Sequence, residues 1–247
     1  MTTLADLGAE LRRADPDRFG ASLVAPAGAR GRLWTLYALH HEFARIPFSV
    51  SEPGLAEIRL QWWADQLARL GAGQRATGHP VLEAVAREWG ADAGGLARLV
   101  EGHFRWCDRA PFAGADDALA MVDATAGALM VAAAGVLAPG LGAVAGQQGR
   151  GAGVAAFLRA WPALEAGGWL RDAPDMAGAL RKAGRTGFAE ARAARRSVPR
   201  VAAGALFAGA GAQSALAGKN LNNPPQPSDF ARRFDLARLA LTGRWWI

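Results

Sequence analysis

Few side chains in this sequence have the type and spacing that metal-assisted chemistry needs. Carboxylates four residues apart share one face of a helix, where together they can hold a divalent metal ion such as Mg²⁺. The sequence contains two such pairs, Asp6 with Glu10 and Glu88 with Asp92. Gly90 interrupts the second pair, and the first lies near the start of the chain. We therefore interpret both pairs as solvated surface charges.

A second group of candidate residues lies between positions 37 and 63. It consists of Tyr37, Glu42, Arg45, Glu52, Arg59, Gln61, Trp62 and Trp63. Glu42 and Arg45 have the spacing of a helical ion pair, and Arg59 is predicted to reach across a helical hairpin to a glutamate. Trp62 and Trp63 point about 100° apart on a helix, so at least one belongs to the core. This charged and aromatic cluster has two interpretations, a binding site or a structural clamp of the hairpin.

The histidines and the cysteine do not form a ligand pattern. His40 and His41 are adjacent and therefore diverge on a helix, and His79 and His103 lack ligand spacing. Cys107 is the only cysteine, so no internal disulfide can form and a reducing compartment is expected. The sequence predicts no metal site and no cofactor.

Composition restricts the class of protein. The chain has 247 residues, 51% hydrophobic and 20% charged, which is enough to bury a full-sized core and excludes a disordered or small disulfide-rich class. No abrupt change in composition divides it, so we expect one domain over 1–247. The net charge of +6 is compatible with an anionic neighbour such as a membrane, and also with compositional bias. The basic residues between 181 and 200 do not share one helix face, so nucleic acid is not expected.

Apolar residues recur with a helical period, and no alternating run indicates a strand, so the fold class is predicted to be all-α. The expected helices are Thr3–Ala14, Ala27–Ile46, Pro53–Leu70, Pro80–Trp89, Gly94–Cys107, Asp116–Leu137, Gly149–Glu165, Asp175–Ser197, Val201–Ala217 and Ser228–Leu241. Residues 219–228, rich in Pro and Asn, form a predicted loop before the last helix. Glycines and a proline interrupt the uncharged stretches 124–149 and 201–218, which favours buried helices over membrane spans.

The segment from Asp15 to Val81 resembles the squalene/phytoene synthase family. The resemblance rests on Asp17-Arg18-Phe19, Tyr37-Ala-Leu, Ile58-Arg59-Leu-Gln61-Trp62-Trp63 and His79-Pro80-Val81. It implies an isoprenoid-synthase-like helical bundle, in which two Asp-rich motifs on facing helices hold Mg²⁺ and prenyl diphosphates. In this sequence the corresponding positions are Ala44, Phe48 and Ala160, so the resemblance implies that the acidic residues are lost.

The hairpin residues are similar to those of a non-enzymatic branch of that family, the mitochondrial complex I (NADH:ubiquinone oxidoreductase) assembly factor 6 group and its bacterial relatives. The similar segments are Glu42-Phe-Ala-Arg45, Phe48-Ser-Val-Ser-Glu52 and Arg59-Leu-Gln61-Trp62-Trp63, with Phe48 replacing an Asp of that branch. The resemblance implies a catalytically inactive assembly or stability factor for respiratory complex I. The alternatives are a prenyltransferase condensing prenyl diphosphates and a non-catalytic protein that retains a lipid or prenyl ligand in its cavity.

The segments at the two ends of the sequence predict where in the cell the protein is located. Residues 1–20 lack the apolar stretch of a signal peptide, so a cytoplasmic protein is expected. Trp245 and Trp246 beside Arg244 are suited to an anionic membrane surface. We expect partners of two kinds, a complex I subunit or assembly intermediate and the inner face of the cytoplasmic membrane.

Overall fold

Local capping signals set the helix boundaries at both ends of the chain. The hydroxyl of Thr3 accepts a hydrogen bond from the backbone of Asp6, whose carboxylate accepts one from the backbone of Thr3, and this capping box begins α1 (Leu4–Ala14). Asp15 caps α2 (Pro16–Ser22), which the sequence patterns had not predicted. Ser228 caps α13 (Asp229–Thr242) after the predicted loop 219–228, which contains no helix.

The computed structural model describes residues 3–75, 78–170 and 174–246. Its first half continues with α3 (Ala27–Ser49), α4 (Pro53–Gly71), α5 (Pro80–Trp89), the 3₁₀-helix η1 (Gly90–Val100) and α6 (Glu101–Phe104). Its second half contains α7 (Ala115–Val122), the π-helical turn η2 (Asp123–Gly127), α8 (Ala128–Leu137), α9 (Gly142–Arg159), α10 (Trp161–Ala166), α11 (Pro174–Ala193), the 3₁₀ turns η3 (Arg195–Ser197) and η4 (Arg200–Ala202), and α12 (Ala212–Ala217). Within the described ranges no strand occurs, only one isolated bridge between Phe112 and Leu170. The all-α prediction is therefore confirmed.

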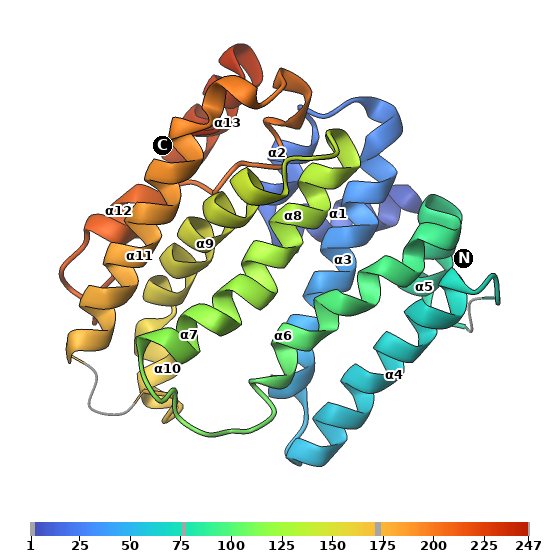
Figure 1. Ribbon diagram of the computed structural model, residues 1–247, viewed down its shortest axis with the longest axis horizontal. Coiled ribbons are helices and arrows are strands. Elements are labelled where there is room, and N and C mark those ends of the chain that lie inside the picture. The colour runs from blue at the N-terminus through green and yellow to red at the C-terminus, as the bar shows by residue number, and fades with distance from the viewer. Residues whose placement is uncertain (1–2, 76–77, 171–173, 247) are drawn as a thin grey trace.

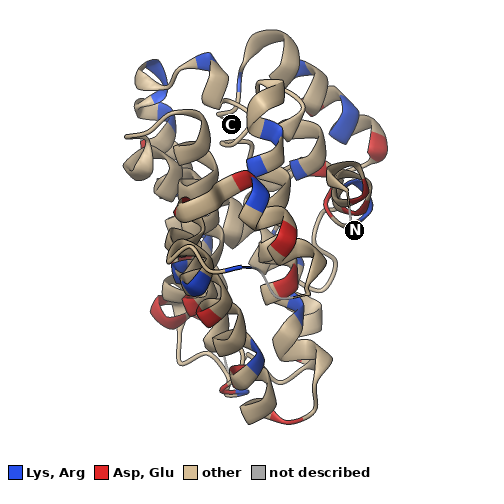
Figure 2. Ribbon diagram, turned by 90° about the vertical axis from the view of Figure 1, so that its right-hand side faces the viewer, with Lys and Arg blue, Asp and Glu red and all other residues tan. Residues whose placement is uncertain are grey.

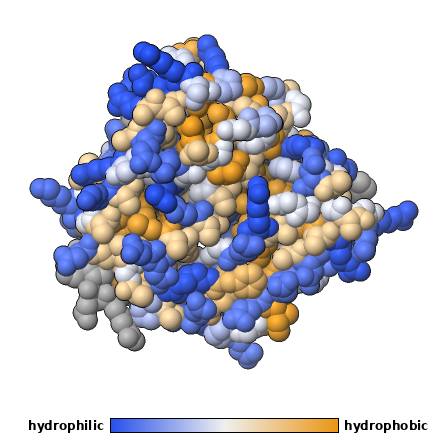
Figure 3. All heavy atoms as spheres, viewed as in Figure 1, coloured by the Kyte–Doolittle hydropathy of each residue, from blue (hydrophilic) through white to orange (hydrophobic). Residues whose placement is uncertain are grey.

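The helices pack side by side in one bundle (Figure 1). The α7–η2–α8 column, α9 and α11 form one half, and α3 with α4, α5 and η1 forms the other, with α3 in contact with α8. Buried apolar side chains form two clusters, a larger one centred on α3 and a smaller one around α9 and α11. On the face seen in Figure 1, apolar patches alternate with hydrophilic side chains, which also project around the rim (Figure 3).

Two predicted helices are wrong in detail because glycine breaks them. Val201–Ala217 was expected as one helix, but only η4 and α12 form there, since Gly209 and Gly211 take the left-handed φ values of +87° and +69°. Gly94–Cys107 was expected to be α-helical, but its first half belongs to the 3₁₀-helix η1, which is followed by the short α6. In η1, Gly94 lies so close to α4 that a Cβ on Gly71 would be 2.7 Å from its Cα.

The expected break in the uncharged stretch 124–149 is confirmed, because α8 ends at Leu137 and α9 begins at Gly142. The predicted helix Gly149–Glu165 is instead the C-terminal part of α9 plus α10, separated at Ala160. Among the described residues, one continuous helical stretch, Ala115–Leu137, is long and apolar enough to cross a membrane by length and composition alone. Of its most apolar window, 44% is buried inside the bundle.

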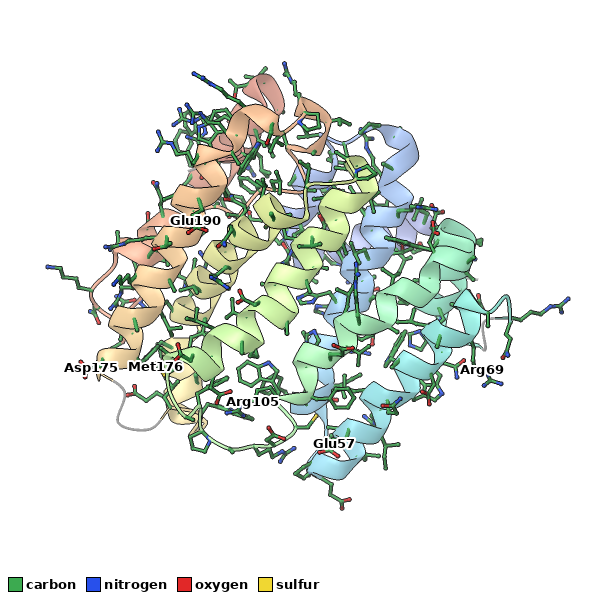
Figure 4. All side chains as sticks on the ribbon, viewed as in Figure 1. Glu57, Arg69, Arg105, Asp175, Met176 and Glu190 are labelled. Carbon is green, nitrogen blue, oxygen red and sulfur yellow. The ribbon has the colours of Figure 1, made fainter. Side chains whose placement is uncertain are left out.

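A charged network holds the loop between α6 and α7 at the lower end of the bundle (Figure 4). Arg105 donates from Nε and Nη2 to the carboxylate of Asp117, at 3.0 and 2.7 Å, and also to the carbonyl oxygens of Ala110 and Pro111. Asp117 accepts a further hydrogen bond from the backbone of Ala113. The network therefore fixes the loop that follows Trp106.

These contacts predict a pH-dependent stability. Hydrogen bonds from Arg105 hold the pKa of Asp117 below its usual value, so the pair stabilises the fold above about pH 4 and loses its effect as the pH falls through the lowered pKa. Asp117→Asn should lower the free energy of unfolding by about 1–3 kcal/mol at pH 7 and by less in acid. Urea titrations across this pH range measure the difference.

Asp108→Asn is the matched control, because Asp108 lies 3.8 Å from the same guanidinium but its side chain is 58% exposed. An exposed pair contributes little, so this variant should change stability by less than about 1 kcal/mol. Equal losses in the two variants would contradict the assignment of the network to Asp117.

Candidate functional site

A cavity of about 380 Å³ opens where α2, α3, α6, α7, η2, α9 and α10 meet. Its size lies within the usual range for small-molecule sites, about 300–1,000 Å³. Its polar lining residues are Arg18, His40, His103 and Thr125. The others are Ala44, Phe48, Trp106, Met121, Val122, Ala126, Gly153, Ala156, Phe157, Ala160 and Leu164. The cavity is thus mainly apolar, and no carboxylate belongs to its lining among the residues that the structure describes.

The positions where the resemblance placed lost acidic residues all lie on this cavity. Ala44 and Phe48 come from the C-terminal part of α3, and Ala160 comes from the junction of α9 and α10 on the facing wall. Leu164, four residues after Ala160, lines the same space. Each wall therefore presents two side chains at the spacing that would let carboxylates share a metal ion, and all four are apolar.

The π-helical turn η2 shapes the wall beside α9. Thr125 and Ala126 line the cavity, and the Thr125 hydroxyl donates to the carbonyl oxygen of Met121 at 2.7 Å. A π-helical turn inserts one residue into the helical register, and such turns occur frequently at functional sites. Here the turn also packs on α6, where a Cβ on Gly102 would lie 2.7 Å from the backbone of Ala124.

Two histidines meet in the cavity wall from separate helices. The rings of His40 and His103 are 5.3 Å apart between centroids, and His103 is 2% exposed. Neither ring nitrogen of His103 has a hydrogen-bond partner. Burial lowers the pKa of His103 to about 4. Burial, with the nearby positive charge of Arg18, also lowers the pKa of His40 well below 6.5, so both rings are neutral at pH 7.

The cationic and acidic groups near the cavity already pair with one another. The Arg18 guanidinium lies 2.5 Å from Asp15 and stacks over the ring of Tyr37 at 5.8 Å. Asp17 accepts hydrogen bonds from Arg232 and from the backbone of Ala210. In consequence, the carboxylates of α2 are committed to structural contacts.

The residues present do not fit a Mg²⁺–diphosphate group. Mg²⁺ is held in proteins mainly by carboxylate oxygens, and the described part of the lining includes none. In the parts of the chain that the structure describes, no group of three or more His, Cys, Asp or Glu side chains is placed to hold a metal ion.

The predicted charged cluster of the hairpin does not form. Arg45 pairs with Glu42 at 2.8 Å, but Glu52 and Arg59 are exposed, and neither belongs to an ion pair in the described part of the chain. The reason lies in α4, whose buried face consists of Ala56, Leu60, Trp63, Gln66, Leu67 and Leu70. Arg59 lies outside that face and points to solvent.

The other hairpin candidates also lie away from the cavity. Trp63 is in the core and Trp62 is partly exposed beside it, as the sequence predicted for at least one of them. Gln61 is exposed and donates to Asp65 at 2.7 Å. Tyr37 is buried, and burial raises its pKa to about 12. None of these side chains lines the cavity.

Sequence reasoning missed the cavity histidines because it tested them only as metal ligands. His40 and His103 are far apart in sequence, and only the packing of α6 against α3 brings their rings together.

The aromatic tail also differs from its expected role at a membrane. Trp245 is 3% exposed and its carbonyl oxygen accepts from Gln148, so this part of the tail folds onto the bundle.

Comparisons with known proteins agree with this geometry. The sequence pattern of the family described as squalene/phytoene synthase matches residues 11–171, which include every residue that lines the cavity. A search of curated proteins gave no match. Because the matched region covers more than half of the chain, the chain belongs to the squalene/phytoene synthase family.

Proposed function

We propose that this chain is a catalytically inactive member of its family that acts as an assembly or stability factor for respiratory complex I. The observation that carries the inactive assignment is that Ala44, Phe48, Ala160 and Leu164, which face one another across the cavity at metal-binding spacing, are all apolar. A fold alone does not determine which reaction a protein catalyses, so the assignment depends on the side chains of the site.

The inactive assignment follows from what departure of a diphosphate requires. A metal ion stabilises the leaving group by withdrawing negative charge, and its ligands must be oxygen atoms on the protein. The apolar side chains supply none. Phe48 instead packs its ring against Trp106 and Trp169, with centroids 5.4 and 6.1 Å away. Arg18 is the one cationic side chain in the lining, and Asp15 already neutralises it.

The complex I assignment is supported by the resemblance of the hairpin to the non-enzymatic branch. That segment includes an exposed apolar face on α4, formed by Leu55, Ile58 and the outer side of Trp62 at helical spacing. Ile58 is 67% exposed, and Arg59 and Gln61 lie beside it in solvent. An apolar centre with a polar rim is the anatomy of a protein–protein interface, so we assign this face to the protein partner.

We also propose a peripheral position on the inner face of the cytoplasmic membrane, held by α13. Phe230, Phe234, Ala237 and Leu241 form one stripe of this helix, and Phe230 and Leu241 are 79% and 77% exposed. The opposite side of α13 packs on α2, where Leu236 lies against Gly20. The stripe therefore faces solvent.

Charge favours an anionic lipid surface as the occupant of this stripe. Arg233 is exposed and lies at about 70° from the stripe on the helical wheel, so it can extend its guanidinium group to headgroups. Arg238, on the other side of the stripe, is half-buried and pairs with Asp235 at 3.2 Å. Arg200 donates to the last carbonyl oxygens of α13 and adds positive charge at that end. At the upper end of the bundle, which carries α13, basic segments are more frequent than acidic ones (Figure 2).

The inactive assignment predicts no turnover of farnesyl or geranylgeranyl diphosphate in the presence of Mg²⁺. Restoring acidic residues on one wall only, with Ala44→Asp and Phe48→Asp, should not create activity, because the facing wall still lacks metal ligands. Product analysis with radiolabelled substrate checks both proteins. Product above a no-enzyme control from the natural chain would establish the prenyltransferase alternative.

The complex I assignment predicts that deleting the gene lowers NADH:quinone activity in isolated membranes without changing polyprenoid content. The natural chain should restore the activity, and a chain carrying Ile58→Asp should not, because a charge in the apolar centre opposes docking. Leu23→Asp is the control, since Leu23 is exposed but lies outside α4. Loss of polyprenoids with normal NADH:quinone activity would refute this function.

The α13 assignment predicts binding to vesicles of equal parts phosphatidylglycerol and phosphatidylcholine, but not to phosphatidylcholine alone. Cosedimentation should weaken as salt rises, because salt screens exposed charges. Phe230→Ser with Phe234→Ser should reduce binding about tenfold or more through lost apolar burial. Leu55→Ser with Ile58→Ser removes two apolar side chains from α4 and should leave vesicle binding unchanged. Equal effects of the two double variants would overturn the assignment.

A further inference from the structure

We infer that the cavity binds an uncharged amphiphile, a long apolar chain carrying a hydroxyl group that hydrogen-bonds to His103. This inference rests on the proposed loss of catalysis at the same site. A cavity without metal ligands favours a ligand whose head group is not a diphosphate.

The wall provides the environment for the apolar chain. Trp106, Val122, Phe157 and Leu164 line the cavity together with the small side chains of Ala156 and others. Burial of apolar surface contributes roughly 25 cal/mol per Å². A methylene chain therefore gains affinity along most of this lining, without any polar group to pair.

His103 provides the single strong demand for a polar partner. Its ring is buried and lines the cavity, and both ring nitrogens lack hydrogen-bond partners. A buried polar group left without a partner is costly. A neutral imidazole has one N–H donor and one acceptor nitrogen, and a hydroxyl group can pair with either. A hydroxyl head at this wall would satisfy a group that the protein itself leaves unpaired.

The electrostatics of the wall disfavour a charged head group. His40 and His103 are neutral at pH 7 because burial lowers the pKa of each. Arg18 is paired with Asp15 at 2.5 Å, so an incoming anion would have to compete for it. A phosphate in this lining would be desolvated without a free cation or metal ion, which is expensive. The same argument applies with less force to a fatty-acid carboxylate.

The test is calorimetric titration of the full chain with decan-1-ol and with decyl phosphate, which share the apolar chain. Decanol should bind at least about tenfold more tightly than decyl phosphate. His103→Phe should weaken decanol binding about tenfold, the effect of losing one hydrogen bond in a buried site. His41→Phe is the matched control, because His41 is exposed on the same helix as His40, and it should bind decanol normally.

A second variant keeps the test decisive if His103→Phe does not fold. Ala160 lines the cavity and its side chain is exposed to that space, so Ala160→Phe should abolish decanol binding by filling it. Decyl phosphate binding as tightly as decanol, or no effect of either variant, would overturn the inference. Failure of decanol to bind would overturn it as well, and would leave the inactive assignment intact. Turnover of prenyl diphosphates would instead overturn that assignment.

Discussion

The close approach of α9 to its neighbours is the constraint on which the site depends. A Cβ on Gly149 would lie 2.9 Å from the carbonyl oxygen of Ala126, and one on Gly153 would lie 2.7 Å from the Cβ of that residue. On the other side, a Cβ on Gly187 of α11 would lie 2.5 Å from the carbonyl oxygen of Gln147. Side chains at these positions would push the helices apart. Glycine thus sets how closely α9 packs on η2, with which it lines the cavity, and on α11, which lies outside the lining.

That geometry leaves a cavity whose chemistry is set by its lining alone. The two walls still present side chains at the spacing of a paired metal site, but the side chains are Ala44, Phe48, Ala160 and Leu164. The same enclosure keeps His103 out of water and uncharged. One framework therefore places apolar side chains at the paired positions and creates an apolar space with one unsatisfied hydrogen-bonding group.

Much of the fold could be predicted from the sequence because its signals are local. Thr3, Ser228 and the prolines at the start of α4 and α5 fix helix ends through capping and backbone geometry. The apolar period fixed the class as all-α, and Gly140 marked the break between α8 and α9. The sequence also gives the residue types at positions 44, 48 and 160, none of which is acidic. The structure then places these three positions on one cavity.

Tertiary packing decided the rest. The sequence placed Arg59 near Glu42 and Glu52, but the buried face of α4 turned it to solvent. It suggested one helix after Val201, but Gly209 and Gly211 take left-handed φ values that interrupt it. The same segment packs against α2, where a Cβ on Gly204 would meet the backbone of Ala21. The meeting of His40 with His103 depends on long-range contacts that no local pattern encodes. Residue type and local geometry are properties of the sequence, whereas the partners and solvent exposure of a side chain exist only once distant helices have packed.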